Sequence, residues 1–186
     1  MKNSACIIGN GNFKYSSAMW KKVDETIYQL IEKGVTRFLF GEYSELGNLC
    51  FFTVGIYKRT HPEIKRIKFN VDYNEKDNTL RRSTEKYDKS IALKLMGNSE
   101  KSVNLRRYMA LITESENCIF FFDDKPNSDT KAAYNYAVQK RKNIILYNPQ
   151  HFKVILPFFV TNESPASHFC ETGLFKAYIE IKRLPW

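Results

Sequence analysis

The sequence is poor in residues that bind metals or act as nucleophiles, with only four Cys and three His among its 186 residues. The cysteines stand at positions 6, 50, 118 and 170, and no two of them have the C-x-x-C spacing of a zinc or redox site. The histidines stand at positions 61, 151 and 168, and none has a Ser or Cys nearby in the context of a nucleophile. The sequence therefore predicts neither a metal site nor a catalytic triad.

Long hydrophobic runs are also missing. No apolar stretch approaches the ~20 residues that a membrane helix needs. Residues 9–12 interrupt the first apolar run too early for a signal peptide. These absences predict a cytoplasmic protein that does not act at a membrane and keeps its thiols reduced. Cys6, Cys50 and Cys118 each fall within an apolar stretch, which predicts that they are small core residues.

Negative charge is in short supply, because 29 Lys and Arg face 20 Asp and Glu and leave a net charge of +9. A basic chain can bind nucleic acid or a phosphorylated ligand. The cations are scattered in pairs and triplets, however, so a solvated basic surface is the simpler interpretation. Aromatic residues make up 15% of the chain, and many lie in apolar runs such as 118–122, which favours a core over a base-stacking surface.

Apolar periodicity predicts strands that alternate with helices through residue 147. The predicted strands cover residues 4–8, 35–40, 64–69, 118–122 and 143–147. Helices are predicted from Ser16 or Ser17 to Gly34, over 45–60, over 85–96, and from starts at Ser102 or Asn104 and at Ser128 or Asp129. This alternation predicts an α/β fold, a Rossmann-like three-layer domain over residues 1–148 with a mostly parallel sheet. Residues 149–186 break the pattern and predict a C-terminal β extension of the same domain at one edge of the sheet.

A ligand site is predicted where the strands end, because open α/β sheets bind ligands outside the carboxyl ends of their strands. Three turns meet there, over residues 9–14, 41–48 and 123–131. The first holds Gly9, Asn10 and Gly11, whose glycines permit a tight turn. The other two lead into helix N-termini, which favour anions. A lone G-x-G does not name the ligand, so the fold predicts only the place of the pocket.

Three stretches together resemble the YpsA-like branch of the SLOG superfamily. Residues 40–50 (FGEYSELGNLC) resemble its G-G-x-G-x-x-D-x-x-C loop and helix start. Residues 107–120 resemble its R-N…M-[IV]-D-x-S-D-x-x-I-F stretch, and residues 128–137 (SDTKAAYNYA) resemble its S-G-T-K-x-A-x-x-Y-A helix start. Order and spacing agree over roughly residues 3–148.

This resemblance implies a Rossmann-like domain that binds a nucleotide or a nucleotide-derived ligand, for example of the ADP-ribose type. The P-G-G-x-G-T-x-x-E motif of the catalytic cytokinin-activating phosphoribohydrolases is absent. The chain also departs from the family pattern at several loop positions, which are Glu42, Ser44, Gly47, Tyr108, Thr113 and Asp129. It retains Gly41, Arg107, Ser128, Thr130 and Lys131. Side chains in place of glycines and added acidic groups, including Glu45, predict weaker phosphate binding or an altered ligand.

These features favour a non-catalytic binding or sensor module, with no catalytic residue predicted. One alternative is a single-stranded nucleic-acid-binding protein, which the net charge, the aromatic residues and the DNA-processing relatives of the fold would suit. Another is a degenerate nucleotide N-glycosidic hydrolase with Glu42 or Glu45 as its carboxylate. A fourth hypothesis is a scaffold with a vestigial pocket. The sequence also leaves open whether the chain forms a homo-oligomer.

Overall fold

A single parallel sheet organises the part of the chain that the structure describes. The computed structural model describes residues 3–9, 16–41, 44–71, 86–93, 100–121 and 128–147. Within these ranges the strands are β1 (Ser4–Gly9), β2 (Arg37–Phe40), β3 (Lys65–Val71), β4 (Lys89–Leu93), β5 (Asn117–Phe121) and β6 (Asn143–Tyr147). They form a six-stranded sheet in the order β4-β3-β2-β1-β5-β6, and every neighbouring pair is parallel. The α/β class and the Rossmann-like three-layer architecture are confirmed.

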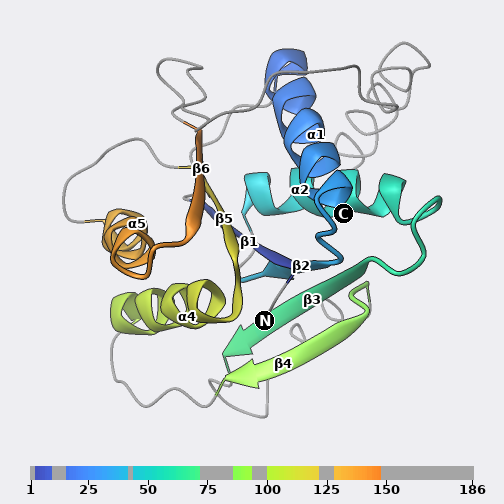
Figure 1. Cartoon of the computed structure of the whole chain (residues 1–186). Coiled ribbons are helices and arrows are strands. Elements are labelled where there is room, and N and C mark those ends of the chain that lie inside the picture. Colours follow the sequence, from blue (N-terminus) through green and yellow to red (C-terminus); the bar gives the residue numbers. More distant parts are fainter. Residues whose placement is uncertain are drawn as a thin grey trace, which may run out of the picture.

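The helices cover both faces of this sheet. They are α1 (Ser17–Glu32), α2 (Glu45–Tyr57), α4 (Glu100–Glu114) and α5 (Asp129–Gln139). Helices α1 and α2 lie on one face, and α4 and α5 lie on the other (Figure 1). Alternate residues of β1 enter opposite cores, because Ala5 and Ile7 pack with α1 and α2 whereas Cys6 and Ile8 pack with α4 and α5. The central strands are therefore buried on both faces, which explains why they read as continuous apolar runs.

The chain reverses its direction of growth across the sheet next to β1. It builds outward from β1 to β4, and α4 then carries it back so that β5 lies on the other side of β1. The register pairs Gly9 of β1 with Phe121 of β5. The carboxyl ends of β1 and β5 therefore lie side by side at the switch in strand order, where ligands of such sheets bind.

Serine side chains begin three of the helices. Ser16, Ser44 and Ser128 each accept a hydrogen bond from the backbone N–H three residues further on. An N-cap of this kind satisfies one of the N–H groups that a helix start leaves without an intrahelical acceptor. The predictions at Ser16 and Ser128 are therefore confirmed, whereas Asp129 is the first residue of α5 and not its cap. Gly34, with φ of +83°, follows α1 in the left-handed conformation that was predicted for it.

The prediction of a helix over residues 85–96 is wrong. Residues 89–93 form β4, which pairs with β3 from Ile67↔Lys89 to Val71↔Leu93. Ile91 and Leu93 pack against the α4–α5 core, which is the two-residue period of a strand and not the helical period. Pairing along β3 overrides the local preference for helix. The predicted caps Ser102 and Asn104 are also wrong, because α4 already begins at Glu100.

The predicted C-terminal β extension over residues 149–186 lies outside the described residues. Among the described helices, none is both long enough and apolar enough to cross a membrane. The three cysteines predicted as core residues, Cys6, Cys50 and Cys118, are buried free thiols.

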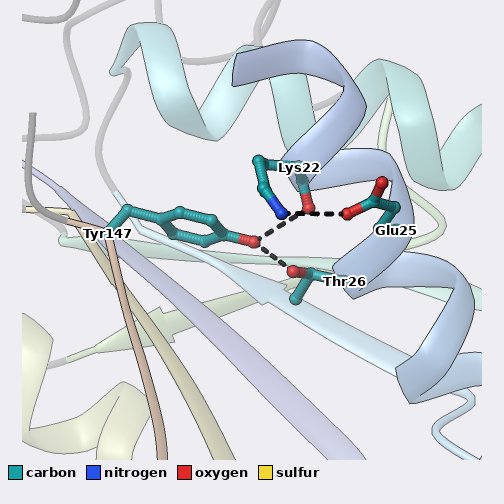
Figure 2. A network of polar contacts seen from close by, with 4 residues as sticks. All are labelled: Lys22, Glu25, Thr26 and Tyr147. Carbon is teal, nitrogen blue, oxygen red and sulfur yellow. Dashed lines mark hydrogen bonds and ion pairs between the residues drawn. The ribbon is translucent and has the colours of Figure 1, made fainter. Parts of the chain in front are cut away.

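Tyr147 joins the end of β6 to α1. Its ring is 3% exposed, and its hydroxyl donates to the Lys22 carbonyl oxygen at 3.1 Å (Figure 2). The same hydroxyl contacts Thr26 Oγ1. Because a carbonyl can only accept, the Tyr147 proton goes to Lys22 and the Thr26 hydroxyl donates to Tyr147. On the helix surface nearby, Lys22 Nζ lies 3.4 Å from Glu25. The Tyr147 hydroxyl therefore links strand β6 to helix α1.

Lys142 holds the end of α4, and its loss has a measurable cost. Its Nζ donates to the carbonyl oxygens of Thr113 at 3.3 Å and Ser115 at 2.5 Å. These carbonyls lie at the helix C-terminus, where a cation is favourable. We expect Lys142→Met to lower the free energy of unfolding by about 1–2 kcal/mol in urea titrations. Lys21→Met removes the same charge from an exposed position of α1 and is the control; an equal loss in both variants would contradict this role.

Candidate functional site at the carboxyl edge of the sheet

Gly9 ends β1 at a point where three elements meet. A Cβ at this position would lie 3.2 Å from Leu46 Cδ2 and 3.4 Å from both the Cβ and the carbonyl oxygen of Phe121. Leu46 is in the first turn of α2, and Phe121 ends β5. The missing side chain therefore lets the start of α2 and the end of β5 close around β1. Asn10 and Gly11, which follow Gly9 in the predicted loop, lie outside the described residues.

Gly41 directly follows β2 and lies against α4. A Cβ here would lie 2.9 Å from Leu111 Cδ1 and 3.4 Å from Arg107 Cδ. The glycine therefore lets the aliphatic stem of Arg107 rest on the backbone at the end of β2. Two residues that sequence similarity had singled out from separate stretches, Gly41 and Arg107, are brought into contact by the fold. The neighbouring Arg106 is exposed, whereas Arg107 is half-buried.

The guanidinium of Arg107 is held by its own helix. Its Nη1 donates to Asn104 Oδ1 at 3.1 Å. A donor and an acceptor three residues apart on a helix lie on neighbouring positions of one face, so this pair restricts the rotation of the Arg107 side chain. Sequence reasoning treated Asn104 as a helix cap and missed this role. The signal that could have found it is the Asn-x-x-Arg spacing within a predicted helix.

The starts of α2 and α5 carry the remaining predicted site residues. The Gly47 N–H donates to Ser44 Oγ at 2.9 Å, and the Lys131 N–H donates to Ser128 Oγ at 3.1 Å. Glu45 and Asp129 are the acidic residues of the two first turns. A carboxylate there stabilises the positive end of its own helix and weakens the attraction of that end for a bound anion.

Thr130 and Lys131 differ in what they offer to a ligand. Thr130 is 3% exposed, so it packs within the protein. The Lys131 side chain is half-buried, with its Nζ 5.7 Å from the centre of the Tyr134 ring.

Glu42 lies outside the described residues. The structure thus groups Gly9 with the start of α2, and Gly41 with Arg107, along one edge of the sheet. The ligand-binding roles of all the predicted residues stay predictions.

The helix that follows β1 differs from the other two serine-capped helices at this edge. Within the described first turn of α1, no residue is acidic. Ser16 caps this helix by accepting from the Met19 N–H at 3.1 Å. The positive end of α1 is therefore the one whose charge is not offset by a carboxylate of its own first turn.

The three described cysteines are buried thiols. Cys6 of β1 is paired in register with Cys118 of β5, and both are completely buried. A hydrogen bond with Cys6 and then burial raise the pKa of Cys118 far above its usual range. Burial likewise raises the pKa of Cys50. Because the thiolate is the reactive form, Cys50 and Cys118 act as core residues and not as nucleophiles, and Cys6 packs in the same core as Cys118.

The comparisons with known proteins identify no family. No family model matches the chain, and no curated protein matches it.

Among the residues that the structure describes, no three His, Cys, Asp or Glu side chains gather as a metal site would require. The carboxyl edge is therefore characterised by its own geometry: two close glycine contacts, one cation held in place and three capped helix starts.

Proposed function

We propose that the carboxyl edge of the sheet binds a nucleotide or nucleotide-derived ligand, such as one of the ADP-ribose type, without chemical conversion. The contact between Gly41 and Arg107 carries this proposal. This contact places the Arg107 guanidinium at the carboxyl edge of a Rossmann-like sheet. The hydrogen bond to Asn104 restricts the Arg107 side chain before any ligand binds. Restricting a side chain in advance lowers the entropy lost on binding. The guanidinium suits a phosphate, which it can bind through two parallel hydrogen bonds.

The phosphate is expected beside the start of α1. The first turns of α2 and α5 already carry Glu45 and Asp129, whereas that of α1 carries no acid. The first N–H groups of a helix have no intrahelical acceptors and point toward an incoming anion. Gly9 lies on the strand that leads to α1, and β2, which Gly41 follows, is the neighbouring strand. A ligand spanning β1 and β2 would then place one phosphate near both α1 and Arg107.

The test compares Arg107→Ala with Arg106→Ala in calorimetric titrations against AMP, ADP-ribose and the unphosphorylated nucleoside adenosine. We expect the phosphorylated ligands to bind the wild-type protein more tightly than adenosine does. Arg107→Ala should weaken their binding by about 10- to 100-fold, which corresponds to roughly 1.4–2.7 kcal/mol for a lost charge-assisted contact. Arg106→Ala removes the same charge from an exposed position of the same helix and should leave binding nearly unchanged.

Three results would count against the proposed function. The first is equal binding of adenosine and AMP, which would remove the role of the phosphate. The second is an equal loss in the Arg106 and Arg107 variants, which would mean that only the overall charge matters. The third is a nucleotide that is cleaved during incubation, as mass spectrometry would reveal, because the proposed module binds its ligand unchanged.

A further inference from the structure

A concentration of positive charge lies at the opposite, amino edge of the sheet. Strands β3 and β4 begin side by side there, next to the end of α2 (Figure 1). The Asp88 N–H donates to the Arg66 carbonyl at 2.9 Å, which brings segments 58–66 and 86–89 into contact. Together the two segments hold six cations against two carboxylates, a net charge of +4. We call these cations the amino-edge patch: Lys58, Arg59, Lys65, Arg66, Lys86 and Lys89.

Asp88 neutralises only the inner members of this patch. Its Oδ1 accepts from Lys58 Nζ, and its Oδ2 accepts from the Arg66 N–H at 2.8 Å and lies 3.8 Å from Arg66 Nε. Partial burial raises the pKa of this carboxyl, but the hydrogen bonds and charges of Arg66 and Lys58 outweigh it and hold the pKa below the usual value. Asp88 therefore stays ionised and is fully engaged with these two residues.

Four cations of the patch remain on the surface. Arg59, Lys65, Lys86 and Lys89 are exposed, and within the described part of the chain none of them forms an ion pair. The other carboxylate, Glu63, lies 3.5 Å from His61. Like charges on neighbouring strands repel one another, so this arrangement gains most from an anionic partner that contacts several of them at once.

Aromatic rings continue the patch onto α2. The guanidinium of Arg66 lies 4.2 Å from the centre of the Phe51 ring, and Tyr87 lies 4.7 Å from the same ring. Phe51 in turn meets Phe52 edge-on at 5.8 Å. The Phe52 side chain is 49% exposed, although it is a large hydrophobic residue. The exposed Phe52 ring is thus connected through the buried Phe51 to Arg66, a cation of the amino-edge patch.

We propose that the amino-edge patch and Phe52 bind single-stranded nucleic acid. The cations contact the phosphates and Phe52 stacks on a base, which is how proteins hold single strands without reading their sequence. A membrane surface fits less well, because it requires a broad apolar helix face, and Phe52 is the one large exposed hydrophobic among the described residues of α2. An acidic peptide would use the cations but not the ring. This surface is separate from the carboxyl edge, so it stands or falls independently of the proposed function.

Fluorescence anisotropy with a labelled oligothymidylate of about 20 nucleotides tests this proposal in the full chain. We expect binding that weakens as salt rises. Lys65→Gln/Lys89→Gln should lower the slope of log affinity against log salt by about 1.4, since each lost phosphate contact on a single strand is worth roughly 0.7. Lys21→Gln/Lys140→Gln removes two exposed charges elsewhere and is the matched control. Phe52→Ala should weaken binding at least about fivefold with little change in slope.

Several outcomes would overturn the proposal. Failure of the wild-type protein to bind the oligonucleotide at low salt, where phosphate contacts are strongest, would rule out a nucleic-acid site. Equal slope changes in the two double variants would reduce the effect to net charge. Binding to polyglutamate or to phosphatidylserine vesicles as tight as to the oligonucleotide would assign the patch to another partner class. A duplex bound as tightly as the single strand, with no effect of Phe52→Ala, would remove the stacking contact on which the single-strand assignment rests.

Discussion

Leu111→Ala is expected to lower the free energy of unfolding by about 2–5 kcal/mol, the range for emptying a fully buried leucine site. Leu111 is completely buried in the α4–α5 core, and its Cδ1 lies 2.9 Å from where a Gly41 Cβ would be. The substitution removes the side chain that packs under the end of β2. We expect the substitution to disturb the carboxyl edge as well, because Leu111 packs against Gly41 and Gly41 lies beside Arg107.

Gly41→Ala tests the same contact from the opposite direction. In the wild-type background the new methyl group meets Leu111 too closely, and overpacking of this kind costs about 1–3 kcal/mol. In the Leu111→Ala background the methyl group enters the vacated space, so the second substitution should cost less or even restore stability. Residues in contact show such coupling, which a double-mutant cycle isolates.

Urea titrations of the four proteins of this cycle provide the measurement. Gly55→Ala is a suitable control, because a Cβ there meets only the movable end of Arg66, at 3.0 Å. Alanine is also favoured over glycine within a helix, so this variant should stay within about 1 kcal/mol of the wild type. Additive losses for Gly41→Ala and Leu111→Ala would show that the two residues do not share the close contact described above.

Tyr147→Phe is expected to reverse its effect on stability between neutral and alkaline pH. At neutral pH the variant loses the hydrogen bonds to Lys22 and Thr26, at a cost of about 1 kcal/mol (Figure 2). Burial raises the pKa of Tyr147 far above its usual range, despite the opposing hydrogen bond from Thr26. Above about pH 10 the unfolded phenol loses its proton while the folded one keeps it, which favours the unfolded state.

The sign and size of the reversal follow from this difference in pKa. The contribution of Tyr147 to wild-type stability is fully present below about pH 10 and falls by about 1.4 kcal/mol for each pH unit above it. Phenylalanine has no such loss, so the two stabilities should cross near about pH 11. Burial also raises the pKa of Tyr87, to about 12, but that phenol is present in both proteins and cancels in the comparison.

Unfolding free energies measured between about pH 7 and about pH 12 check this prediction. Thr26→Val serves as the control, because it removes a hydrogen bond to Tyr147 but keeps the phenol. This variant should stay below the wild type by a similar amount at every pH. A constant difference between Tyr147→Phe and the wild type across the range would mean that the phenol titrates alike in the folded and unfolded states.

The local sequence was sufficient wherever one pattern dominated. Continuous apolar runs identified β5 and β6. For β5 the reason is that a strand buried on both faces carries no polar alternation, whereas β6 is only partly buried. Serines before apolar helical patterns identified the starts of α1 and α5, because a cap depends only on residues within one turn. Once these elements alternated, a parallel sheet with helices on both faces followed, and with it the expectation of a site at the carboxyl edge.

Tertiary structure decided what depends on distant partners. Residues 89–93 form β4 because β3 offers them a neighbouring strand, a contact that no local window contains. The same holds for the candidate site, where Arg107 meets Gly41 across 66 positions of sequence only because α4 crosses back over the sheet. Sequence alone thus determined the elements other than β4, and which edge of the sheet could hold a ligand. Long-range packing determined which side chains meet there, because the free energy of those contacts appears only when the layers close on one another.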